Sequence, residues 1–164
     1  MNEKDLICLA NKVVTPLIES GVTLSVAESC TGGWLSKTLT DVSGISAIYK
    51  GGICSYSNEI KIKLLGVSPE TLGTFGAVSE QTAREMAQGI RNAMGTDVGI
   101  GITGIAGPAS DNTHKPVGLI YVAISQGNKT LVKELRNNFT ENIRLNNRLS
   151  AVETALNLLG GINE

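Results

Sequence analysis

Residues 97–108 read DVGIGITGIAGP, and they are the best guide to the architecture of this chain. Asp97–Ile102 is short and apolar and carries two glycines, a pattern that predicts a strand covered by helices on both faces. The strand continues directly into the glycine-rich loop Thr103–Pro108. In open α/β sheets, ligands bind at the edge where such loops leave the carboxyl ends of the strands.

The sequence before this stretch alternates between strand and helix patterns. Strands are predicted at 23–28 and 47–56, and a helix is predicted after each of them. Either Ser57 or Asn58 can cap the second of these helices. Ser79 caps a further helix whose apolar residues repeat at helical spacing.

The sequence after it contains a hairpin signal and a last helix. Segments 117–125 and 129–135 flank Gln126-Gly127-Asn128, and leucines at helical spacing run from Leu145 to Leu159. We therefore expect an α/β fold, a three-layer α/β/α sandwich with a mixed sheet. The length of 164 residues suits a single domain spanning 1–164.

Composition restricts the class of protein. Apolar residues make up 41%, aromatic residues 4%, and the net charge is −1, which argues against disorder and against a nucleic-acid partner. One histidine and three widely spaced cysteines give no metal-binding pattern and suit a reducing compartment. The charged N-terminus and the lack of a long apolar run predict a cytoplasmic protein without membrane contact. The many glycines favour a small-molecule pocket.

Three loops, 28–33, 56–61 and 103–108, are predicted to meet at one edge of the sheet. The first places Ser29, Cys30 and two glycines at the start of a helix, where free amides favour a phosphate or an oxyanion. Alternatively, Thr31 is only an N-cap and the glycines serve tight packing.

Lys61 is predicted to lie in the first turn of its helix, where the macrodipole disfavours a cation. Burial there would favour the neutral amine, which can take the proton of a serine hydroxyl. The alternative is a solvated surface lysine. Tyr56 could relay a proton or simply pack. Arg144 and Arg148 are spaced i,i+4, so either could receive a phosphate or carboxylate, and surface ion pairing is the alternative.

Several ordered motifs together resemble the CinA C-terminal domain family. They are AESCTGG (27–33), GG (51–52), YSNE-x-K (56–61), LGV (65–67), GAVS (76–79), GIAGP (104–108) and KPVG (115–118). The resemblance covers about residues 5–160 and suggests the stand-alone form, without the molybdopterin-binding-like domain that many members carry.

The resemblance implies an amidohydrolase that converts nicotinamide mononucleotide to nicotinate mononucleotide and ammonia in pyridine-nucleotide recycling. Ser29 would be the nucleophile and Lys61 its general base, with Tyr56 close by. Ser46, Thr103 and Arg148 match positions that line the family's substrate pocket. It also implies no metal, no cofactor and a homo-oligomer (dimer or larger). The family's Gly-Asp-Arg run before the last helix is not matched here, so Arg144 competes with Arg148 for that role.

On this reading, the amides of Thr31, Gly32 and Gly33 hold the oxyanion, while the backbone from Thr103 through Gly104 to Gly107, with Arg148, holds the phosphate. One alternative uses Cys30 as nucleophile with Glu28 and Lys61. Another is a non-catalytic nucleotide-binding protein or a competence- or DNA-damage-associated partner.

Overall fold

The computed structural model describes residues 1–163 and confirms the α/β sandwich with a mixed sheet. The strands are β1 (Leu24–Glu28), β2 (Tyr49–Cys54), β3 (Val98–Gly104), β4 (Leu119–Gln126) and β5 (Lys129–Arg136). The helices are α1 (Glu3–Ser20), α2 (Trp34–Thr40), α3 (Asn58–Leu65), α4 (Pro69–Phe75), α5 (Glu80–Met94) and α6 (Ile143–Gly160), with 3₁₀ turns η1 (Ile45–Ala47) and η2 (Gly161–Asn163). No helix within residues 1–163 is long and apolar enough to span a membrane.

The sheet has the order β2-β1-β3-β4-β5. β1 is parallel to both of its neighbours, and the β4–β5 hairpin extends the sheet antiparallel from β3. Glu28, the last residue of β1, pairs with Cys54 on one side and Ile102 on the other. The three parallel strands therefore end at the same level, which brings the loops that follow them together.

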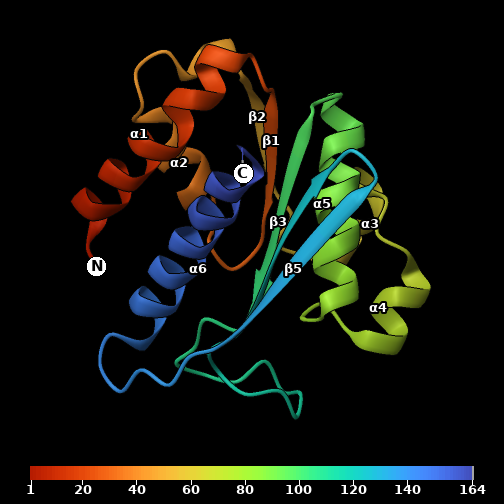
Figure 1. Ribbon diagram of the computed structural model, residues 1–164. Coiled ribbons are helices and arrows are strands. Elements are labelled where there is room, and N and C mark those ends of the chain that lie inside the picture. The colour runs from red at the N-terminus through yellow and green to blue at the C-terminus, as the bar shows by residue number, and fades with distance from the viewer. Residues whose placement is uncertain (164) are drawn as a thin grey trace.

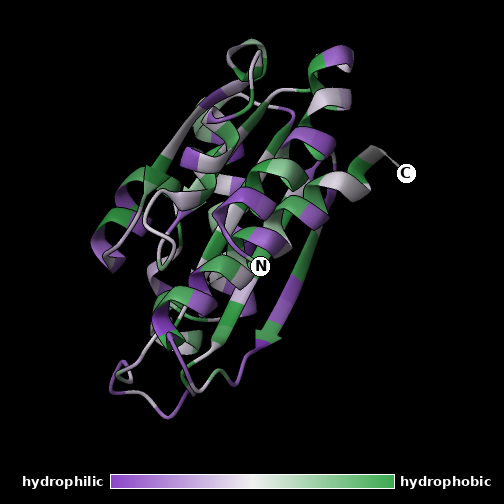
Figure 2. Cartoon of the chain, turned by 90° about the vertical axis from the view of Figure 1, so that its left-hand side faces the viewer, coloured by the Kyte–Doolittle hydropathy of each residue, from purple (hydrophilic) through white to green (hydrophobic). Residues whose placement is uncertain are grey.

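Helices cover both faces of the sheet (Figure 1). α1, α2 and α6 lie on one face, and α5, with α3 and α4 beyond it, lies on the other. Seen from the side of α1 and α6, hydrophilic and hydrophobic stretches alternate along the helices, as expected for elements with one buried face (Figure 2).

β3 is buried along nearly its whole length, as its glycine-containing apolar sequence predicted. A Cβ atom at Gly99 would lie 2.2 Å from the Ala87 carbonyl oxygen, and one at Gly101 would lie 2.6 Å from that of Ala83. Both carbonyls belong to α5. The two glycines thus let α5 lie directly against the central strand.

The sequence patterns did not predict α4. Ser68 caps this helix by accepting hydrogen bonds from the amides of Glu70 and Thr71, but none of the seven residues in α4 is buried. A short helix that lies on the surface carries no apolar periodicity. Only the Ser-Pro start could have revealed it.

Candidate active site

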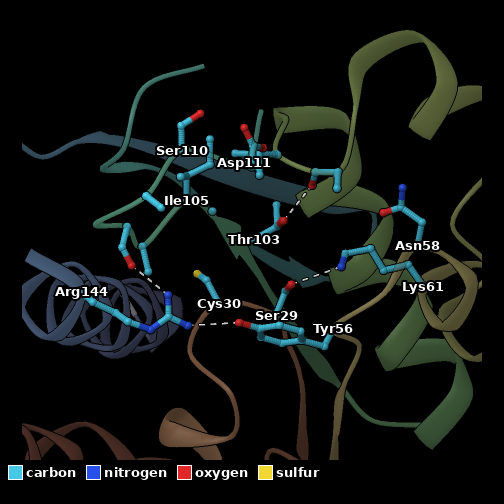
Figure 3. Close-up of a pocket in the computed structure, with 16 residues that line it drawn as sticks. Ser29, Cys30, Tyr56, Asn58, Lys61, Thr103, Ile105, Ser110, Asp111 and Arg144 are labelled. Carbon is cyan, nitrogen blue, oxygen red and sulfur yellow. Dashed lines mark hydrogen bonds between the residues drawn. The ribbon is translucent and has the colours of Figure 1, made fainter. Parts of the chain in front are cut away.

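The three loops predicted to meet at the sheet edge do so around a cavity of about 320 Å³ (Figure 3). Ser29 comes from the end of β1, Tyr56 from the loop after β2, and Lys61 from α3. The end of β3 and the loop after it contribute a further wall, Thr103–Gly107.

The Lys61 amine lies next to the Ser29 hydroxyl at the floor of this cavity. Its Nζ is 3.2 Å from the Ser29 Oγ and donates a hydrogen bond of 2.6 Å to the Ser55 carbonyl oxygen. Lys61 is only 2% exposed. Desolvation by burial lowers the pKa of the Lys61 amine below its ordinary value, and Lys61 has no ion pair within residues 1–163. The site therefore favours an uncharged amine beside a serine hydroxyl.

The local sequence fixes the position of Lys61. Ser57 is the N-cap of α3 and accepts a hydrogen bond from the Ile60 amide at 3.2 Å. Lys61 then falls in the first helical turn, where the positive end of the helix dipole opposes a second positive charge. Its backbone amide donates to the Ser57 carbonyl, which ties the lysine directly to the cap.

Glu28 organises the loop that carries Ser29. Its buried carboxylate accepts hydrogen bonds from the Thr31 hydroxyl at 2.6 Å, from the backbone amides of Leu35 and Ser36, and from the Ser36 hydroxyl. A carboxylate at the start of α2 is also favoured by the helix dipole. All of these contacts are to residues 31–36, so the Glu28 carboxylate holds the loop in its conformation.

Cys30 lines the cavity next to Ser29. Burial raises the pKa of its thiol to about 12. Because the thiolate is the nucleophilic form of cysteine, this thiol is poorly suited to attack an amide near neutral pH.

The two arginines of α6 occupy different places. Arg144 lines the cavity and donates to the Gly107 carbonyl at 2.9 Å and to the Tyr56 hydroxyl at 3.1 Å. Arg148, favoured from the sequence for the substrate pocket, lies outside this cavity. It donates to the carbonyls of Cys30 and Thr31 and stacks over the Trp34 ring. Arg148 therefore braces the loop that carries the serine.

Part of the predicted pocket lies elsewhere. Thr103, Gly104 and Gly107 line the cavity, but Gly32 and Gly33 line a separate shallow hollow with Arg148. The Thr31 side chain is buried against Glu28.

Ser46 also lies outside the cavity. It is exposed in η1, just before β2, and the neighbouring Ile48 carbonyl accepts from the amide at the start of β1. It is thus at the opposite end of the sheet from Ser29.

Sequence reasoning did not single out every lining residue. Ala77 and Val78, from the loop before α5, and 109–111, from the loop after Pro108, complete the cavity. Their spacing in the sequence did not predict a place in the cavity, because that place depends on how two distant loops fold over the sheet edge. Asn58 could have been found, since it precedes Lys61 by three residues and shares its helix face.

The fold and this site define an α/β protein with a buried lysine beside a half-buried serine at the carboxyl edge of its parallel strands. The sequence model of the CinA C-terminal domain matches residues 7–162. The chain belongs to this family, as its motifs suggested.

Known proteins of the family are similar over much of the chain. A CinA-like protein of Kosmotoga olearia is 52% identical over 124 residues, which cover 76% of this chain and 30% of that protein. The chain spans about a third of the length of the curated relatives it matches. Among solved structures, the competence/damage inducible protein CihA from Agrobacterium tumefaciens is 40% identical with a TM-score of 0.92, covering 98% of this chain and 96% of that one. A CinA superfamily protein from Escherichia coli is 31% identical with a TM-score of 0.87, covering 98% and 92%.

Proposed function

We propose that this protein is an amidohydrolase that deamidates nicotinamide mononucleotide to nicotinate mononucleotide and ammonia. The observation that carries the proposal is the Lys61 Nζ, which is buried and 3.2 Å from the Ser29 Oγ. A buried amine with a lowered pKa is a competent general base near neutral pH, and a serine next to it is an activated nucleophile.

The reaction proceeds through an acyl-serine. Neutral Lys61 takes the Ser29 proton as Oγ attacks the carboxamide carbon, and the carbonyl oxygen becomes an oxyanion. The C–N bond then breaks, and the Lys61 ammonium gives its proton to the departing nitrogen, which leaves as ammonia. Lys61 next takes a proton from the water that attacks the ester. As the C–Oγ bond breaks, the Lys61 ammonium returns this proton to Oγ and restores Ser29, and the released acid loses its own proton to solvent as the carboxylate.

The cavity presents one guanidinium, that of Arg144, to a substrate that carries a phosphate, and its one acidic lining residue within 1–163 is Asp111. Within residues 1–163, Arg144 and Lys61 are the only basic side chains that line it. Because burial lowers the pKa of the Lys61 amine, the guanidinium of Arg144 is the fixed positive charge available to a phosphate. Tyr56, whose hydroxyl accepts from Arg144, would hold the guanidinium in place.

The direct test is an ammonia-release assay on nicotinamide mononucleotide, with nicotinamide and NAD as comparison substrates. Turnover is expected with the mononucleotide and should be much slower with nicotinamide, which lacks the phosphate. Ligand binding without ammonia release would instead support a non-catalytic nucleotide-binding protein. Faster release from nicotinamide would contradict the role given to Arg144.

Cys30→Ala and Cys30→Ser are expected to keep ammonia release within about tenfold of wild type, because a protonated thiol is not the nucleophile. Iodoacetamide should modify the exposed Cys8 and Cys54 without abolishing turnover. Loss of activity in both Cys30 variants, with the fold intact by circular dichroism, would favour the thiol route.

A further inference from the structure

The proposed reaction needs a hydrogen-bond donor for the oxyanion, and Gly32, one of the donors expected in the loop after Ser29, already uses its amide within the loop. The Gly32 amide donates to the Ser29 carbonyl at 3.0 Å, and the Trp34 amide donates to the Thr31 carbonyl. Gly32 and Gly33 also line the separate hollow beside Arg148. A side-chain donor on another wall of the cavity could therefore serve the substrate.

Two polar side chains of that cavity already donate to other parts of the protein. The Thr103 hydroxyl donates to the Ala77 carbonyl at 2.7 Å. The Arg144 guanidinium donates to the Gly107 carbonyl and to the Tyr56 hydroxyl. In Figure 3, Arg144 lies on one side of Ser29, and Lys61 lies on the other.

Asn58 offers an exposed side-chain amide, unpaired within residues 1–163, on the lysine side. It is the first residue of α3, one turn before Lys61, and lines the same cavity, into which its side chain points (Figure 3). Ser57 already caps the helix, so Asn58 is not needed for that purpose. Across residues 1–163, its side-chain amide makes no hydrogen bond.

We propose that the Asn58 side-chain amide binds the carboxamide of the substrate, an inference that rests on the proposed function. Nδ2 donates to the carboxamide oxygen, where negative charge develops during attack, and Oδ1 accepts from the carboxamide NH₂. The Asn58 amide and the substrate carboxamide can then each donate one hydrogen bond to the other and accept one from it. The carboxylate product instead places an oxygen opposite Oδ1, which disfavours the product and helps its release.

Two substitutions separate this role from a structural one. Asn58→Ala removes the amide, while Asn58→Asp keeps its size but replaces the donor with an acceptor. Aspartate in the first turn of a helix is favoured by the dipole, so Asn58→Asp should fold at least as stably as wild type. Both variants are expected to lose about 10²–10³-fold in kcat, the usual effect of removing one oxyanion donor. Lys63→Ala, on the exposed side of the same helix, is the matched control and should keep wild-type kcat.

A binding measurement tests recognition of the carboxamide separately from catalysis. Calorimetry on Ser29→Ala is expected to show a preference of about tenfold for nicotinamide mononucleotide over nicotinate mononucleotide, the value of one hydrogen bond. Adding Asn58→Ala should remove that preference while leaving the affinity for nicotinate mononucleotide nearly unchanged.

The outcomes distinguish the two proposals. If the wild type releases ammonia and both Asn58 variants match it in kcat, the role of Asn58 is overturned and the hydrolase stands. If the wild type does not turn over but the amide preference depends on Asn58, the hydrolase fails and carboxamide recognition stands. If neither turnover nor an amide preference is found, both are overturned.

Discussion

Lys61→Met is expected to lower kcat for ammonia release by about 10²–10⁴-fold, the range for loss of a general base. Methionine fills a similar volume but cannot take the Ser29 proton. Lys61→Arg is the matched control because it keeps a basic side chain that does not deprotonate near neutral pH. It should be as inactive as Lys61→Met. If Lys61→Arg kept most of the activity, the role of Lys61 would be that of a positive charge, and the general-base mechanism would be wrong.

The pH dependence of kcat provides a second readout on the same residue. Because burial lowers the pKa of the Lys61 amine, activity should rise with pH as the amine loses its proton and then level off below the ordinary lysine pKa. This rise of activity with pH should be absent from the residual activity of Lys61→Met. A wild-type profile that keeps rising to the ordinary lysine pKa would contradict a buried, neutral base.

Lys61→Met should raise stability while it lowers activity. Between the lowered pKa of folded Lys61 and its ordinary value, the unfolded chain binds one more proton than the folded chain, so wild-type stability rises with pH in that window. The cost of burying the amine is therefore greatest at low pH. Lys61→Met avoids it and should unfold at a higher Tm near pH 7, by about 2–4 °C for each 1 kcal/mol gained. The advantage should shrink as the pH approaches 10.5.

The sequence predicted the main elements of the fold because each has a local signal. Ser57 and Ser79 act as N-caps, and Gly127 with Asn128 forms the two-residue connection of the β4–β5 hairpin. The order of the strands was not predicted. That β3 lies between β1 and β4 follows from tertiary packing, above all from the close approach of α5 that Gly99 and Gly101 permit.

The candidate site was predicted where a local signal fixes its residues: Ser29 follows the end of β1, and Lys61 follows the Ser57 cap of α3. It was not predicted where the position depends on contacts between distant segments. Arg144 and Arg148 share one helix face, yet Arg144 meets the loop at Gly107 while Arg148 meets the carbonyls of Cys30 and Thr31. The spacing places both arginines near the sheet edge, but only the folded loops decide which one faces the cavity.

Ser29→Ala is expected to cause the largest loss, about 10⁴–10⁶-fold in kcat, as for removal of the nucleophile of a catalytic unit. Substrate affinity should change little, because the Ser29 hydroxyl contacts the lysine at the cavity floor while Arg144 binds at another wall. Ser43→Ala, at an exposed position, is the matched control and should retain full activity.

The double variant Ser29→Ala/Lys61→Met provides the strictest test, because nucleophile and base act as one unit. Once either residue is removed, the other no longer contributes to catalysis. The double variant should therefore be no slower than Ser29→Ala alone. Additive losses would mean that Lys61 acts on the substrate independently of Ser29, for example by activating water for direct attack on the amide. The 3.2 Å contact between the amine and the hydroxyl favours the first outcome, since a base this close to the serine is placed to take its proton before that of any water.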